Sequence, residues 1–151
     1  MRIHGYIFGM LALMGASLGA GCDEALSSVT GPTPNLVPTF SSIQREIFDA
    51  VDSSGRLACI QCHTAVGRNP AAGMNLTSAT SYAALVGVAS LAKPGAVRVI
   101  PGDPENSYLV HKLEGRAGIV GRRMPFVGPP YMTDGQILVV KRWIELGARN
   151  D

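Results

Sequence analysis

The sequence has little excess of charge of either sign, and it has few cysteines, no internal repeat and few long apolar runs. The 13 basic and 11 acidic residues leave a formal net charge of only +2. Binding to nucleic acid needs a concentrated basic surface, so the charge balance excludes it as a function. No segment carries paired carboxylates, and no repeat is visible. We therefore expect no independent catalytic constellation and a single copy of any binding motif.

The main apolar run, residues 6–20, lies near the amino end and follows a basic residue, Arg2. It is too short and too rich in glycine to cross a bilayer, which takes about 20 apolar residues, and we interpret residues 1–21 as an export signal. Residues 18–22, Leu-Gly-Ala-Gly-Cys, resemble a bacterial lipobox, in which the cysteine is lipidated and becomes the new first residue. Cys22 is therefore the predicted lipidation site. The alternative is an ordinary cleaved signal that leaves Cys22 as a stray thiol.

Residues 22–40 contain several Ser, Thr and Pro residues and few large apolar ones. This composition predicts an extended tether between a membrane anchor and a folded module at residues 41–151. Within the module, the sequence predicts short helices joined by long ordered loops, because the chain holds 18 Gly and 10 Pro.

Capping patterns mark the first and the last helix of the module. The first is expected to begin at Ser41 or Ser42, with Gln44 completing a capping box. The last is the clearest, since Thr133 and Gln136 form a second capping box before an apolar helical face.

Two further helices are expected, at about residues 78–86 and over residues 103–115, where Asp-Pro-Glu opens the segment and a glycine ends it. The one strand-like piece, residues 97–100, is too short to make a sheet without partners. The sequence therefore predicts an all-α fold.

Residues 59–63 form a C-x-x-C-H run, the attachment pattern for c-type haem. Thiols three positions apart, Cys59 and Cys62, can reach both vinyl groups of one porphyrin. The adjacent His63 is then carried under the ring, where its imidazole can take the proximal position on iron. With Cys22 assigned to lipid, no cysteine is left over and no disulfide is needed. The sequence predicts one covalently bound haem c.

Three other uses of the cysteine pair are weaker. A disulfide between Cys59 and Cys62 would suit an oxidising compartment, but the adjacent His63 favours haem. A zinc site needs two more ligands at suitable spacing, and the mature chain offers only His111 as a further nitrogen ligand. A thioredoxin-like dithiol needs a strand–helix–strand context, which the sequence lacks.

The sixth iron ligand has four candidates. Met124 is followed by Pro125 in a loop bracketed by glycines and prolines, and a thioether delivered from such a loop suits a cytochrome c. Met74 and Met132 stand where an ordinary apolar residue would serve, so packing is the favoured reading for both. His111 lies within the third helix, where a single histidine is more often a surface residue than a ligand.

The order of further motifs resembles the small monohaem cytochrome c-like domains of bacterial lipoproteins and the haem modules of planctomycete-type multidomain proteins, over about residues 41–149. Around the C-x-x-C-H run, the motifs that carry the resemblance are Ile-Phe (47–48), Gly-Met-Asn-Leu (73–76), Tyr-Ala-Ala-Leu (82–85), Pro-Gly-Asp-Pro (101–104), Ser-Tyr-Leu (107–109), Met-Pro (124–125) and Trp-Ile-Glu-Leu-Gly-Ala (143–148). The resemblance implies a cytochrome c-like fold, in which the first and last helices cross near the haem and Phe48 meets Trp143. It also implies that Met124 is the distal ligand.

Basic residues cluster around the loop that leads to Met124, with only Glu114 opposing them: Lys112, Arg116, Arg122 and Arg123. They can hold a haem propionate, form a rim that docks an acidic redox partner, or simply keep the loop soluble. The sequence does not choose among these three roles.

With His63 and Met124 both on iron, no open position remains for a substrate. We therefore expect an electron carrier rather than an enzyme, tethered at the periplasmic or cell-envelope face of a membrane and serving a protein donor and a protein acceptor. The alternatives are a haem subunit of a larger oxidoreductase, or an open-site haem sensor or peroxidase in which Met124 is absent from the iron.

Overall fold

A computed structural model of the chain describes residues 35–151. The predicted signal, the predicted lipidation site Cys22 and most of the predicted tether lie outside the described residues. Within residues 35–151, no helix is both long enough and apolar enough to cross a membrane.

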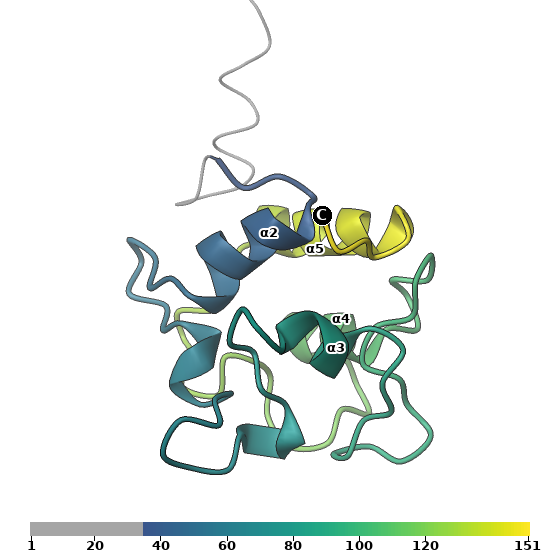
Figure 1. Cartoon of the computed structure of the whole chain (residues 1–151), viewed down its shortest axis with the longest axis horizontal. Coiled ribbons are helices and arrows are strands. Elements are labelled where there is room, and N and C mark those ends of the chain that lie inside the picture. Colours follow the sequence, from purple (N-terminus) through teal and green to yellow (C-terminus); the bar gives the residue numbers. More distant parts are fainter. Residues whose placement is uncertain (1–34) are drawn as a thin grey trace, which may run out of the picture.

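The helices are short, and loops make up much of the described chain. In chain order the elements are α2 (Phe40–Ile43), a π-helical turn η1 (Gln44–Phe48), the 3-10 turns η2 (Cys59–Gln61) and η3 (Ala71–Gly73), α3 (Ser81–Leu85), α4 (Tyr108–Glu114) and α5 (Asp134–Glu145). Residues 97–100 form only isolated bridges, such as that between Val86 and Val99, and no sheet forms among residues 35–151. In Figure 1, α2 and α5 lie together on one side, α3 and α4 lie beneath them, and loops fill the opposite side.

The capping box of α5 is confirmed. The Thr133 side chain accepts from the backbone N–H of Gln136, and the Gln136 side chain accepts from the backbone N–H of Thr133. This motif is local, so the sequence alone specifies it.

The predicted cap of the first helix is wrong. Thr39 caps α2, through a hydrogen bond from the Ser42 N–H to its side chain. Gln44 does not complete a capping box, because its amide donates to the Leu76 carbonyl at 2.9 Å and accepts from the Ser81 hydroxyl at 2.6 Å. Contacts more than 30 residues away in sequence therefore override the local pattern.

The third helix begins later than predicted, at Tyr108 instead of Asp103. Residues 103–106 form a turn, in which the Asp103 carboxylate accepts from the backbone N–H of Asn106. The Ser107 hydroxyl donates to the Asp103 carbonyl and accepts from the Ile100 N–H. Gly115 ends α4 in the left-handed conformation, at φ 73°, as the sequence predicts.

The core gathers around Phe40, which is 5% exposed. Its ring lies 5.3 Å from that of Trp143 on α5, 5.2 Å from that of Tyr82 and 6.3 Å from that of Phe48, measured between ring centroids. The aromatic partner of Trp143 is therefore Phe40 and not Phe48, whose ring meets that of Phe40 edge to face. Leu36 is also buried in this core, so packing begins within the segment assigned to the tether.

Asp151 caps the N-terminus of α2. The Phe40 N–H donates to the Asp151 carboxylate and the Ser41 N–H to the Asp151 carbonyl, both at 2.8 Å. The Trp143 indole donates to the Arg149 carbonyl at 2.8 Å. The two ends of the described chain are thus joined on the side formed by α2 and α5 (Figure 1).

Candidate functional site

The C-x-x-C-H run forms a tight turn. The carbonyl of Cys59 accepts from the N–H groups of both Cys62, at 3.2 Å, and His63, at 3.0 Å. A neighbouring segment holds this turn in place, since the Ala71 N–H donates to the Cys62 carbonyl and the Leu76 N–H donates to the His63 carbonyl. Both cysteines and His63 line the same cavity.

The tautomer and the charge state of the His63 imidazole suit ligation to a metal. Its side chain is largely buried, with 9% of the residue exposed, and Nδ1 lies 3.0 Å from the Ala71 carbonyl oxygen. A carbonyl can only accept, so Nδ1 carries the proton and Nε2 keeps its lone pair. Burial lowers the pKa of the imidazole, and the nearby cations Arg98 and Lys112 lower it further, against hydrogen bonds to the backbone that raise it. The ring is therefore neutral at pH 7, the form that binds metals.

The two cysteines are free thiols. Burial raises the pKa of the Cys59 thiol to about 11, and its Sγ donates to the Ile47 carbonyl at 3.6 Å. A dithiol oxidoreductase needs a cysteine with a lowered pKa, so Cys59 does not suit that chemistry. In the part of the chain that the structure describes, no group of three or more His, Cys, Asp or Glu side chains could hold a metal ion by itself.

Two adjoining cavities, of about 290 and 270 Å³, meet at this turn. Cys59 and Cys62 line only the first. His63 and Met124 line both, together with Ala71, Met74, Leu109 and Phe126. The pair of cavities reaches the size of a typical cofactor site, about 300–1,000 Å³, and its walls are largely apolar.

The loop that carries Met124 is fastened to the end of α4. The Met124 N–H donates to the Lys112 carbonyl at 2.9 Å, and the Arg123 guanidinium donates to the Leu113 carbonyl at 2.7 Å. The Lys112 ammonium donates in return to carbonyls of the loop, those of Val120 and Arg122. Met124 is thus delivered to the cavity wall from a segment separate from the cysteines.

The other candidates for the sixth ligand differ in position. Met74 lines both cavities, but it follows the segment whose backbone already holds the His63 imidazole. Met132 lines the first cavity and is 4% exposed within the hydrophobic core. His111 lines neither cavity, and its Nε2 lies 2.6 Å from the Glu105 carbonyl oxygen. Met124 also packs against the core, but unlike Met74 it is carried by a loop that is fastened to α4 and not to the histidine turn.

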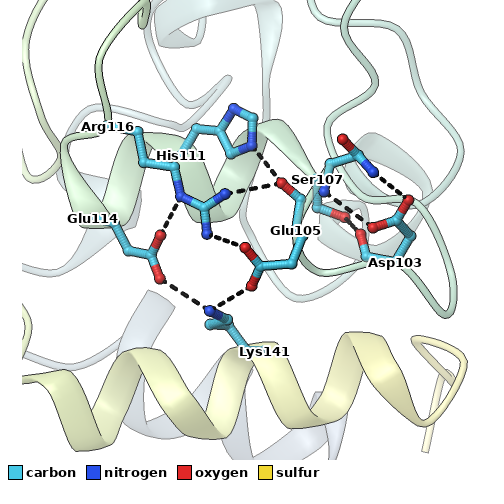
Figure 2. A network of polar contacts seen from close by, with 8 residues as sticks. Asp103, Glu105, Ser107, His111, Glu114, Arg116 and Lys141 are labelled. Carbon is cyan, nitrogen blue, oxygen red and sulfur yellow. Dashed lines mark hydrogen bonds and ion pairs between the residues drawn. The ribbon is translucent and has the colours of Figure 1, made fainter.

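The basic residues around the Met124 loop do not form one cluster. Arg116 turns away from the loop to ion pairs with Glu105, at 2.8 Å, and with Glu114. Lys141 on α5 joins the same two carboxylates, at 2.7 and 3.3 Å, and so connects α4 with α5 (Figure 2). Lys112 and Arg122 remain at the cavity, where both line the second cavity.

Two buried arginines in the cavity walls escaped the sequence analysis. Arg56 is 1% exposed, lines the first cavity and forms an ion pair with Asp52 at 3.0 Å. Arg98 is 7% exposed and lines the second cavity. It stands within the apolar run of residues 97–100, and a charged residue in such a run is the signal that could have revealed it.

The site could hold one iron porphyrin. It offers two thiols at one end, an imidazole with a free lone pair and a thioether from another segment, within apolar walls. Its other end, the second cavity, contains cationic and no acidic residues, which suits the carboxylates of such a group. Comparisons of the chain with protein-family models, with curated proteins and with solved structures found no match.

Proposed function

We propose that this chain is a c-type cytochrome with a cytochrome c-like fold, which carries single electrons between protein partners. One observation supports this above all. The four residues that the sequence predicts as haem ligands line one apolar cavity, although Met124 is more than 60 residues away from Cys59, Cys62 and His63.

Bound haem supplies one-electron chemistry at its iron. In this proposal Cys59 and Cys62 hold it through thioether bonds, and His63 and Met124 ligate the iron. The hydrogen bond from His63 Nδ1 to the Ala71 carbonyl fixes the ring and its tautomer. The bond from the Met124 N–H to the Lys112 carbonyl fixes the loop that presents the thioether.

Fixed ligands favour electron transfer over catalysis. With His63 and Met124 both holding the iron, no site would remain for oxygen or peroxide, and the surrounding apolar residues would disfavour water. Phe126, which lines both cavities, is 55% exposed, so the cavities open to the surface beside the Met124 loop. An electron carrier needs such an opening, where a partner can come close to the cofactor through a small, transient interface.

The location is part of the proposal and is supported by the sequence alone. Residues 1–21 as an export signal and Cys22 as a lipidation site would tether the module at the periplasmic or cell-envelope face of a membrane. Haem of this type is attached after export, so the signal and the C-x-x-C-H run support each other.

The test is the optical spectrum of the purified protein, oxidised and reduced, with three variants. We expect covalent haem in the wild type and a weak far-red band in its oxidised form, lost in Met124→Ala. The band should remain in Met74→Leu and in Met132→Leu, which are matched controls that remove the other two thioethers. A high-spin wild-type spectrum with ready binding of carbon monoxide to the reduced form would overturn the carrier function and favour an open-site sensor or peroxidase.

A further inference from the structure

The second cavity has unbalanced charge. Arg98, Lys112 and Arg122 all contribute to its wall, and no acidic residue does. Among residues 35–151, none of these three cations forms an ion pair. The wall therefore carries three positive charges that the described part of the chain does not neutralise.

The acidic residues nearest to Lys112 in the sequence are engaged elsewhere. Figure 2 shows the carboxylates of Glu105 and Glu114 held by Arg116 and Lys141, between α4 and α5. The Asp103 carboxylate accepts from the side-chain amide of Asn106, at 2.7 Å. None of these carboxylates lines the second cavity.

Of the three cations, Arg98 has the greatest need of a counter-charge, because it is almost fully buried. Its guanidinium donates to the carbonyls of Ala84, at 2.6 Å, and Ala72, at 3.1 Å. Carbonyl dipoles satisfy its hydrogens but leave its charge uncompensated, and a buried charge without a counter-charge is costly. In keeping with this, burial lowers the pKa of both Arg98 and Lys112.

We infer that Arg98, Lys112 and Arg122 form a carboxylate-binding wall, which receives the propionate groups of the cofactor proposed above. The inference rests on the proposed function, since the propionates arrive with the haem. In haem the vinyl and propionate groups lie on opposite sides of the ring. The two sets of protein groups are divided in the same way, because the cysteines line only the first cavity and the three cations only the second.

The wall also affects the reduction potential. Two propionates against three cations leave a positive excess, which favours the reduced iron because it carries one positive charge fewer. Removing one cation should therefore make reduction less favourable, even though none of the three residues ligates the iron.

The experiment measures the reduction potential of the haem-loaded protein by spectroelectrochemistry. Lys112→Gln removes the charge but keeps a hydrogen-bond donor, and we expect the equilibrium constant for reduction to fall about tenfold, a drop of about 59 mV for one electron. Lys112→Arg keeps the charge and should retain the wild-type potential. Arg142→Gln is the matched control, since Arg142 is exposed on α5, pairs with Glu145 and lines neither cavity. It should also leave the potential unchanged.

The far-red band is recorded with each potential, so that a loss of methionine ligation is not mistaken for an electrostatic effect. Where Lys112→Gln disturbs the band, Arg122→Gln gives the same test, because Arg122 is exposed and its side chain fastens no loop carbonyl.

An unchanged potential in a charge-removing variant that keeps both its haem and its band overturns the inference and leaves the proposed function standing. A wild-type potential that shifts with inorganic phosphate, but not with chloride at equal ionic strength, also overturns it, since a diffusible anion then occupies the wall. Absence of covalent haem from the wild type overturns the proposed function itself.

Discussion

Substituting Gly115 by alanine tests how firmly the Met124 loop is held. Gly115 has φ 73°, and an L-residue in this left-handed region costs about 1–2 kcal/mol. A Cβ there would also lie 2.9 Å from Cδ of Arg123, so that side chain must shift. The shift breaks its hydrogen bond to the Leu113 carbonyl and its contact with the Tyr131 ring, 4.4 Å from the centroid. At this half-buried site we assign the two contacts together about 1 kcal/mol.

Gly121 provides a control for the backbone contribution. It lies in the same loop at φ 69°, and a Cβ there meets no atom within 4 Å. In urea denaturation, Gly115→Ala should lose about 1 kcal/mol more than Gly121→Ala, or about 4 °C more in melting temperature. The far-red band of the haem-loaded protein should weaken in Gly115→Ala and persist in Gly121→Ala, because Arg123 is the neighbour of Met124. Equal losses in the two variants would refute the argument that Arg123 fastens the loop.

Two further predictions concern stability. Burial raises the pKa of Glu114, but hydrogen bonds from Arg116 and Lys141 lower it overall, so its stabilising contribution is present at neutral pH and is lost as the pH falls. Glu114→Gln should therefore be less stable than the wild type by about 1 kcal/mol at pH 7, and the difference should shrink as the pH falls through the lowered pKa of Glu114, as followed by urea denaturation across pH; a constant difference would contradict this. Phe40→Ala should cost about 3–5 kcal/mol because it empties the centre of the aromatic core, whereas Phe126→Ala, at an exposed site, should cost under about 0.5 kcal/mol. Similar unfolding midpoints for these two variants would show that Phe40 does not hold the core.

The sequence predicts best what depends on neighbours along the chain. The capping box at Thr133 and the end of α4 at Gly115 need only a few consecutive residues, and both are confirmed. The capping box predicted with Gln44 fails because its side chain meets Leu76 and Ser81 instead, and no local pattern specifies those contacts. The partner of Trp143 likewise depends on which of two nearby phenylalanines the tertiary packing selects.

The candidate site divides in the same way. The C-x-x-C-H run is specified by its own spacing, and the Met-Pro pair by its loop. The paired cavities could not be foreseen, nor could the burial of Arg56 and Arg98, because each arginine is surrounded by segments distant in sequence. The sequence also could not predict that Arg116 and Lys112 have different partners. Both are near one loop in the sequence, but Arg116 pairs with Glu105 whereas Lys112 lines the second cavity.

The contact between Phe40 and Asp151 also bears on the order in which the segments of the chain can pack. A chain under synthesis carries the first helix and the cysteine turn long before it carries α5, so during that interval Phe40 has no Trp143 to pack against and no Asp151 to cap it. The segment of residues 36–48, whose Ile47 and Phe48 line the cavity, reaches its final packing only when α5 and Asp151 are present. Closure of the core thus joins segments 111 residues apart in sequence, and the same step completes the wall of the cavity that Ile47 and Phe48 line.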